Sequence, residues 1–333
     1  MKQSLKQKKI LFFSPAFFGY EIKMKEAMEE MGAEVVFFDE RSITKSYEKA
    51  LLKVVPSIFQ KKTEKYYFDI LEQVKDKNFD YVFFVKCDMP TAKVLIEYRK
   101  VFSTAKFCLY LFDSVLNIPG VESKFKYFDK ISTFDRKDSI EKKIEFRPLF
   151  YGKEYQQNEY KDEFLYDLCF IGTIHSDRYK ILKVIEAQAK EKGLNMYFYP
   201  FLQSKFIYYF YKCFKKEYKK TSISDFKFDK ISSREIADIV AKSRLIVDIQ
   251  HPKQTGLTMR TIEMLGMNKK IMTTNSDIKN YDFYNDNNIQ IIERDHIKID
   301  ANKLQNDYQA LDEQVYDSYS IYSWALDALG EVR

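Results

Sequence analysis

The chain has 333 residues, of which 45% are hydrophobic and 31% charged, and its formal net charge is +6 at pH 7. This length predicts two domains of roughly 150 residues each, and the abundance of Phe and Tyr over Gly excludes a disordered or fibrous protein. The mild positive charge favours acidic partners such as phosphates or anionic lipid and does not by itself indicate nucleic acid.

Several patterns restrict the cellular setting. No apolar run reaches the roughly 18 residues of a membrane-spanning helix, and residues 1–9 are basic without the apolar core of a signal peptide, so a cytoplasmic protein is expected. The cysteines form no CxxC pair and are expected to be buried free thiols. They are Cys87, Cys108, Cys169 and Cys213. With three histidines and no DxD spacing, neither a metal nor a cofactor is required.

The first half of the chain alternates strand-like apolar runs with helical segments. Strands are predicted at residues 9–15, 34–40, 81–86, 106–113, 130–135 and 144–150. An amphipathic helix is predicted at 20–32, and residues 42–78 are predicted to be mainly helical. Strands that alternate with helices indicate βαβ units and a parallel sheet covered on both faces.

A polar segment at 151–163 is predicted to be the linker, and a second alternating series follows it. Its predicted strands are 165–173, 195–201, 244–250, 269–275 and 288–293, and its helices are 176–193, 233–243 and 256–266. The predicted fold is therefore α/β, with two tandem Rossmann-like, doubly wound domains facing a cleft, at residues 1–155 and 156–318. A helix at 319–333 is expected to pack back on the first domain. Ligands of such sheets bind outside the carboxyl ends of the strands.

The stretch "FIGTIHSDRY" has the composition of an anion-binding turn. It places Gly172 and Thr173 where the first strand of the second domain ends, with Ser176 or Asp177 as N-cap and Arg178 entering the helix. Backbone N–H groups at such a turn approach an anion, and a guanidinium offers a planar fork to phosphate oxygens. The alternative is an ordinary turn with a solvated arginine.

The stretch "TGLTMRTIEMLGMNKK" repeats that arrangement in a short helix opened by Gly256 and closed by Gly266. Arg260 stands in its first turn, against the positive end of the helix dipole, so an anion is expected nearby. An arginine can hold a diphosphate while Glu263, three residues on, accepts hydrogen bonds from the vicinal hydroxyls of a ribose. An internal Arg260–Glu263 ion pair is the alternative. A sugar nucleotide would use both anion-binding turns.

These two stretches, in a tandem α/β chain, resemble the bacterial GT-B glycosyltransferases of the capsular polysaccharide or lipopolysaccharide type. The resemblance implies a UDP- or GDP-sugar held by the second domain, with Arg260 near the diphosphate and Glu263 near the ribose. The implied nucleotide-sugar site comprises Gly172, Thr173, Ser176, Arg178, Gly256, Leu257, Thr258, Arg260 and Glu263. Related retaining transferases carry two glutamates here; the second matches Glu263, whereas Thr255 stands in place of the first. The stereochemical outcome stays open.

The first domain would then hold the acceptor. Gly19, in "SPAFFGYE", lies after the first strand, where backbone can approach a sugar or phosphate or simply form a turn. Asp113 ends a strand and is the candidate general base for an acceptor hydroxyl, or else a turn cap. His175 and His251 are alternative proton or phosphate partners.

Residues 204–220 mix six lysines with one glutamate and many aromatic residues. This composition predicts a basic amphipathic helix on an anionic membrane surface, the alternative being a domain helix with a solvated basic face. The lysines expected to face the membrane are Lys212, Lys215, Lys216 and Lys219.

The function expected from the sequence is a metal-independent glycosyltransferase, with no cofactor beyond its donor. It would move a sugar to a hydroxyl of a surface glycan or lipid-linked acceptor, at the inner face of the plasma membrane. A nicotinamide-dependent oxidoreductase would need a fingerprint such as GxGxxG, and "SPAFFGYE" has a single glycine. A non-catalytic nucleotide- or membrane-binding assembly protein is the other alternative.

Overall fold

The computed structural model describes residues 4–41, 56–156, 164–252 and 255–331. It divides into two compact units: unit 1 comprises Met1–Leu149 and Ile321–Arg333, and unit 2 comprises Phe150–Ser320. The chain therefore crosses into unit 2 after Leu149 and returns at Ile321, whereas the sequence-based boundaries fall after residues 155 and 318.

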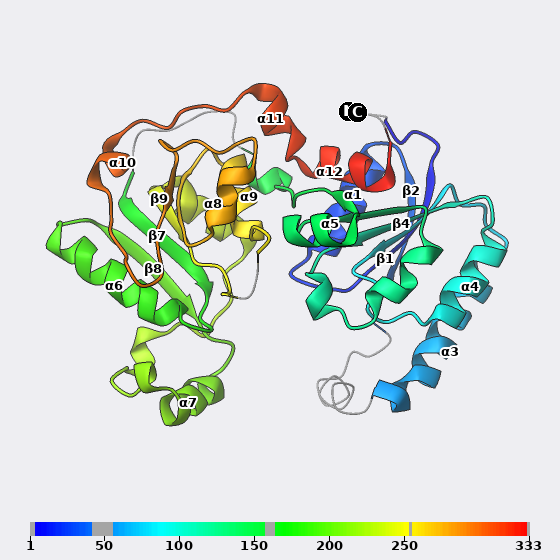
Figure 1. Ribbon diagram of the computed structural model, residues 1–333, viewed down its shortest axis with the longest axis horizontal. Coiled ribbons are helices and arrows are strands. Elements are labelled where there is room, and N and C mark those ends of the chain that lie inside the picture. The colour runs from blue at the N-terminus through cyan, green and yellow to red at the C-terminus, as the bar shows by residue number, and fades with distance from the viewer. Residues whose placement is uncertain (1–3, 42–55, 157–163, 253–254, 332–333) are drawn as a thin grey trace. The chain divides into compact units, whose positions relative to one another are not determined.

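Unit 1 is built on a six-stranded parallel sheet with the order β2-β1-β3-β4-β5-β6. Its strands are β1 (Lys9–Ser14), β2 (Glu34–Asp39), β3 (Tyr81–Val85), β4 (Lys106–Leu111), β5 (Lys130–Thr133) and β6 (Glu145–Phe146). Its helices are α1 (Tyr20–Glu30), α3 (Pro56–Val74), α4 (Ala92–Val101), α5 (Arg136–Lys142) and α12 (Ile321–Leu329). Strands β1, β3 and β4 are almost wholly buried, because helices cover both faces of the sheet (Figure 1).

Two predictions in unit 1 need adjustment. The strand expected at 144–150 is only two residues long, because Pro148 lacks the N–H that a longer ladder with β5 would require. Residues 42–78 were expected to be mainly helical, and helix α3 begins there at Pro56, because proline suits the first helical position. Residues 42–55 lie outside the described part of the chain.

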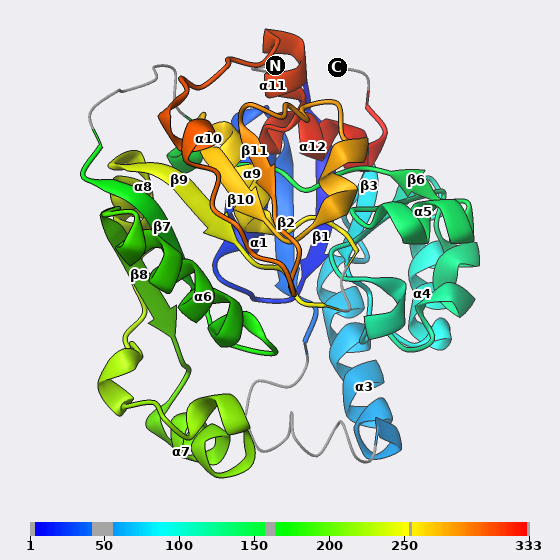
Figure 2. The same ribbon diagram turned by 60° about the vertical axis from the view of Figure 1, so that its left-hand side comes forward.

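Unit 2 contains a second parallel sheet, of five strands, with the order β11-β10-β9-β7-β8. Its strands are β7 (Tyr166–Thr173), β8 (Met196–Phe201), β9 (Ser243–Asp248), β10 (Lys270–Thr273) and β11 (Ile289–Ile291). Its helices are α6 (Arg178–Glu191), α7 (Lys205–Phe214), α8 (Ser233–Ala241), α9 (Met259–Gly266), α10 (Ala301–Gln305) and α11 (Glu313–Ser318). Helix α6 covers one face of the sheet and α8 and α9 the other (Figure 2). The predicted doubly wound α/β fold is confirmed in both units.

The two glycines expected to open and close α9 are not its capping residues. The helix begins at Met259 with Thr258 as its N-cap. Gly266 is the last helical residue, and a Cβ there would lie 2.5 Å from a ring carbon of Tyr151. Its small size therefore serves close packing, while Asn268, with a φ of 51°, provides the left-handed residue beyond the helix.

The segment predicted to be a linker is partly structured. A short 3-10 helix, η3 (Lys153–Tyr155), buries Tyr155 against α8 and α9, and residues 157–163 lie outside the described part of the chain. Three of the cysteines are buried as predicted, but Cys213 is exposed on α7. None of the described helices is long and apolar enough to cross a membrane.

Candidate functional site

The carboxyl ends of the five unit 2 strands lie along one edge of the sheet, because every described strand pair in it is parallel. The turns after β7, β9, β10 and β11 therefore meet there. Both anion-binding turns predicted from the sequence lie at this edge, one before α6 and the other before α9. We call it the carboxyl edge of unit 2.

The turn between β7 and α6 is tight. Ser176 adopts a left-handed backbone conformation, with a φ of 51°. A Cβ on Gly172 would lie 3.1 Å from the ring of Phe170, so the strand end is closely packed. The N-cap of α6 is Asp177, whose side chain makes no capping hydrogen bond. Its carboxylate is used instead by an arginine from another loop.

That arginine is Arg294, in the loop after β11. Its NH1 nitrogen lies 2.8 and 2.9 Å from the two carboxylate oxygens of Asp177, and its NH2 nitrogen donates to the carbonyl of Gln250 at 2.8 Å. Arg294 thus ties the turns after β7, β9 and β11 together. Arg294 was not predicted from the sequence. Its position just after the predicted strand at 288–293 could have indicated that it lies at the same edge of the sheet.

Arg178 also holds turns at this edge. Its NH1 nitrogen donates to the carbonyl of Thr173 at 2.6 Å, and its NH2 nitrogen donates to the carbonyl of Ile249. Burial lowers the pKa of Arg178, and the charges of Arg294 and Arg260 act in the same direction. The charges of Asp248 and Asp177 oppose this shift. The planar fork that was expected to face phosphate oxygens is therefore engaged with the backbone at the ends of β7 and β9.

Two histidines face one another at the carboxyl edge. The ring centroids of His175 and His251 are 5.4 Å apart. Burial lowers the pKa of His175 to about 4, and the positive charges of Arg178, His251 and Lys215 act in the same direction, with Asp177 opposing them. His175 is therefore neutral at pH 7 and too weak a base for efficient proton abstraction there. The same positive surroundings favour an anion.

Helix α9 is fixed to the end of β9 by a small polar network. Buried Asp248 accepts hydrogen bonds from the hydroxyls of Thr258 at 2.8 Å and Thr261 at 2.5 Å. The hydroxyl of Thr258 in turn caps the helix by accepting from the Thr261 amide at 3.2 Å. Asn275, after β10, donates to the carbonyl of Thr255 at 3.0 Å and so holds the loop containing Gly256. The start of α9 is consequently preorganised.

Arg260 and Glu263 form the internal ion pair that the sequence left as an alternative. An Arg260 guanidinium nitrogen lies 3.6 Å from a Glu263 carboxylate oxygen, and the side chains are 20% and 4% exposed. Burial raises the pKa of nearby Tyr155, and the Glu263 charge raises it further while Arg260 lowers it. The pair therefore lies inside unit 2, toward η3. Glu263 supplies a negative charge near Arg260, where the sequence led us to expect an anion.

In unit 1, Asp113 was expected to end a strand, but β4 ends at Leu111 and Asp113 lies two residues beyond it, where its carboxylate has several partners. One oxygen accepts from the Ser114 amide at 3.0 Å and the Asn117 side chain at 2.9 Å, which is the turn-capping role left open by the sequence. The other lies 3.4 Å from the ammonium of Lys86. Gly19 adopts a φ of 78° at the start of α1, a conformation that favours glycine.

The loop after β3 contains features that sequence reasoning missed. Lys86 and Cys87 are both left-handed, with φ values of 83° and 60°. Buried Glu40 accepts from the Cys87 and Met89 amides at 3.1 and 3.0 Å, which holds this strained loop in place. Burial and neighbouring Asp88 raise the pKa of Glu40 well above its ordinary value. No alternation pattern could reveal these contacts.

A hollow of about 700 Å³ lies elsewhere in unit 2, beside β11 and α10. Gln290, Ile292, Lys298 and Lys303 are among its lining residues. None of the residues predicted to hold the nucleotide sugar lines it, so it is not the predicted site. Among the described residues, no group of His, Cys, Asp and Glu is arranged to hold a metal ion.

The fold is similar to those of solved nucleotide-bound proteins. No protein-family model matches the sequence, and no curated protein matches it. The crystal structure of HepE from Anabaena in complex with UDP and glucose aligns over 97% of this chain and 95% of its own, with a TM-score of 0.52 and 11% identity. The same protein in complex with UDP-glucose gives a TM-score of 0.51.

A second similar structure is the catalytic domain of starch synthase IV from Arabidopsis thaliana, bound to ADP and acarbose. It aligns over 98% of this chain and 96% of its own, with a TM-score of 0.52 and 8% identity. Two Rossmann-like units with parallel sheets, similar along nearly the whole chain to these proteins, define the GT-B fold.

Proposed function

We propose that the protein is a glycosyltransferase whose nucleoside diphosphate sugar binds at the carboxyl edge of unit 2. One observation carries this proposal: α6 and α9 both begin at that edge, so the positive ends of two helix dipoles converge there. The GT-B fold supports it, because similar structures contain UDP-glucose or ADP.

The diphosphate is assigned to the two turns before these helices. Gly172, Thr173 and Ser176 offer backbone N–H groups on one side, and the Gly256–Thr258 loop offers them on the other. In this proposal Arg178 and Arg294 keep the turns in position through their contacts with backbone and Asp177. Neutral His175 donates a ring N–H to a phosphate oxygen.

The ribose is assigned to Glu263, and Arg260 adds positive charge near the diphosphate. A carboxylate has about four acceptor positions, so Glu263 can bond Arg260 and a ribose hydroxyl together. The arginines and helix termini would neutralise the departing diphosphate, which supports a transfer without metal.

The acceptor is assigned to unit 1. Its hydroxyl oxygen would attack the anomeric carbon of the sugar, the bond between that carbon and the diphosphate oxygen would break, and the nucleoside diphosphate would leave. Asp113 is proposed to take the hydroxyl proton. A hydroxyl of a surface glycan, free or lipid-linked, is the proposed acceptor, as the capsular or lipopolysaccharide resemblance implies.

Calorimetric titration of the full chain with UDP, GDP and NAD tests the donor assignment. We expect UDP or GDP to bind and NAD not to bind. Arg260→Ala should weaken the binding by roughly 1.5 to 3 kcal/mol, whereas Arg234→Ala, on the exposed surface of α8, should not. Binding of NAD alone would favour an oxidoreductase instead.

Turnover of nucleotide sugars tests the catalytic assignment. We expect release of the nucleoside diphosphate, accelerated by a glycan acceptor and unchanged by a metal chelator. Nucleotide binding without any turnover, across sugars and acceptors, would indicate a non-catalytic binding protein. Inhibition by the chelator would contradict metal independence.

A further inference from the structure

Helix α7 exposes an unusual apolar face. Phe206, Tyr209, Phe210, Cys213 and Phe214 recur at helical spacing on one side of it. Among the aromatic side chains of this face the exposed fractions are 78% for Phe206, 57% for Tyr209, 51% for Phe210 and 74% for Phe214. We call these four residues the aromatic face of α7. Phe210 and Phe214 contact each other, with ring centroids 4.8 Å apart.

The opposite side of α7 anchors the helix to unit 2. Tyr208 is buried in the core, and Ile207 and Tyr211 pack against it. The Tyr208 hydroxyl donates to the carbonyl of Thr221 at 3.0 Å. The helix is therefore held firmly by one face, and the exposure of the other is not a result of loose packing. An exposed cluster of large aromatic side chains marks an interaction surface.

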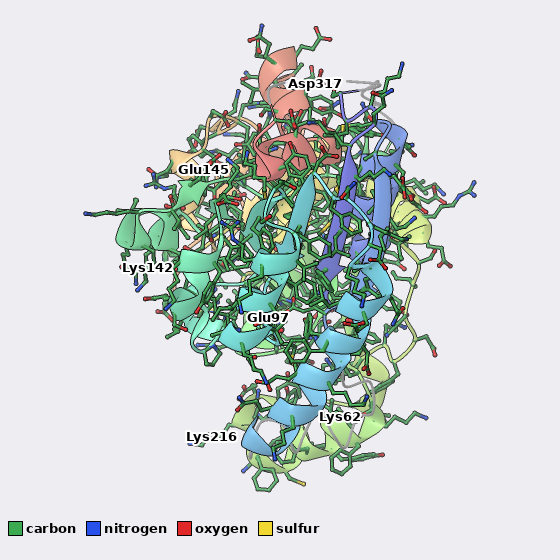
Figure 3. The ribbon with its side chains drawn as sticks, turned by 90° about the vertical axis from the view of Figure 1, so that its right-hand side faces the viewer. Lys62, Glu97, Lys142, Glu145, Lys216 and Asp317 are labelled. Atoms are coloured by element: carbon green, nitrogen blue, oxygen red, sulfur yellow. The ribbon has the colours of Figure 1, made fainter. Side chains whose placement is uncertain are left out.

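Exposed lysines flank this aromatic face at the two ends of α7. Lys205, at the start of α7, and Lys216, Lys219 and Lys220, just beyond its end, are exposed. The side chain of Lys216 lies at the outer surface of this region (Figure 3). Lys215 is half-buried, with its ammonium 3.9 Å from the ring centroid of Tyr211.

Two of the four lysines expected to face the membrane, Lys212 and Lys215, are not fully exposed. Lys212 makes hydrogen bonds within unit 2. Its ammonium donates to the Thr221 carbonyl at 2.7 Å and the Tyr208 hydroxyl at 3.1 Å. It is thus turned toward the anchored side of α7. The exposed positive charge is carried by Lys205, Lys216, Lys219 and Lys220, which we call the basic rim.

We propose that α7 docks the protein on an anionic lipid surface, with its aromatic face in the headgroup region and the basic rim against lipid phosphates. The combination carries the proposal: aromatic side chains partition into the membrane interface, and a positive rim matches negative headgroups. Another protein surface would need to supply both an apolar pocket and a ring of acidic groups. The proposal does not depend on the identity of the donor.

Sedimentation of the full chain with vesicles tests this proposal. We expect binding to vesicles containing phosphatidylglycerol, weak binding to phosphatidylcholine alone, and loss of binding as salt is raised. A rim variant with glutamine at the four rim lysines should bind at least about 100-fold more weakly, since each lysine near the surface contributes roughly fivefold. The matched control places glutamine at four exposed lysines elsewhere in unit 2, namely Lys180, Lys192, Lys279 and Lys298. Equal loss in both variants would indicate a net-charge effect and overturn the proposal.

A fluorescence experiment locates the aromatic face even if the multiple variants fold poorly. The chain has a single tryptophan, Trp324, which is buried in unit 1. Phe210→Trp should therefore give a new emission that shifts to the blue on anionic vesicles and is quenched by brominated lipid. Val184→Trp, on the exposed side of α6, should show neither effect.

Self-association is the competing outcome for the aromatic face. Light scattering of the wild type and of a variant with serine at Phe206, Phe210 and Phe214 distinguishes it. A dimer that the serine variant loses, together with unchanged vesicle binding, would assign the face to a second copy. Failure of the wild type to bind anionic vesicles at low salt would also overturn the proposal, whatever the nucleotide titration shows.

Discussion

The Arg260–Glu263 pair allows the structural and donor-binding roles of Arg260 to be separated. At 3.6 Å, an effective dielectric constant of about 20 gives an attraction of roughly 4 to 5 kcal/mol. Because Glu263 is almost fully buried and Arg260 only partly so, part of this attraction offsets desolvation. We expect Arg260→Met to destabilise α9 by about 2 to 3 kcal/mol, chiefly by removing the positive charge 3.6 Å from the buried Glu263 carboxylate.

The double variant Arg260→Met with Glu263→Gln removes both charges together. Its α9 should recover to within about 1 kcal/mol of the wild type, since neither member of the pair then carries a charge. Hydrogen exchange of the α9 amides measures this local stability. The fluorescence of Trp324, in unit 1, serves as a control that should not change.

Nucleotide binding by the folded double variant then decides the donor role. If Arg260 neutralises a diphosphate, the variant should bind UDP or GDP roughly 10- to 150-fold more weakly despite its recovered stability. Wild-type affinity in this variant would refute our reasoning and leave Arg260 with a purely structural role.

Three further predictions concern single side chains. Asp113→Asn keeps the hydrogen bonds of the turn and should lower turnover by roughly 100-fold with unchanged nucleotide affinity; unchanged turnover in the kinetic assay would exclude Asp113 as the base. Glu263→Gln should weaken binding of ribonucleotides more than of their 2′-deoxy forms, and equal losses in calorimetry would contradict the ribose contact. The lowered pKa of His175, about 4 against 6.5, means that the unfolded chain takes up a proton first as the pH falls. Its contribution to stability is therefore present above about pH 6.5, and the free energy of unfolding should fall as the pH decreases from about 6.5 toward about 4. In urea unfolding measured at several pH values, His175→Gln should remove this part of the pH dependence of stability. An unaltered pH dependence would contradict a lowered pKa of His175.

The sequence predicted the fold well because its strongest signals are local. Buried parallel strands such as β3 and β4 appear as continuous apolar runs, and the helices between them have regular apolar spacing. Cys213 illustrates the limit of this reasoning. It lies in an apolar helix and was expected to be buried, yet it is seven residues after Phe206 and shares its exposed face. Apolar composition alone cannot tell which side of a helix the core covers.

The site was predicted only as far as local turns could indicate it. Gly172, Thr258 and Arg260 were selected from their positions beside strand and helix ends. Arg294 was missed because its partner Asp177 is 117 residues away in the chain. Glu40 contacts amides 47 and 49 residues away. Such partners depend on which strand ends become neighbours in the sheet. The order of strands in a sheet cannot be read from a short stretch of a single sequence.

The return of the chain to unit 1 has a consequence for the order in which the protein folds. Helix α12 packs against α1, β4 and β5, with the Trp324 ring centroid 4.9 Å from that of Tyr110. Asp327 of the same helix pairs with Arg147 at 2.9 Å. During synthesis the ribosome makes all of unit 2 before α12, so the part of the unit 1 sheet at β4 and β5 that α12 covers stays exposed until then. Unit 2 is contiguous and can form first, whereas unit 1 begins earlier and finishes later. A chain that stops at residue 320 would leave an aromatic surface uncovered in unit 1, and we expect it to aggregate even though every strand of both sheets is present.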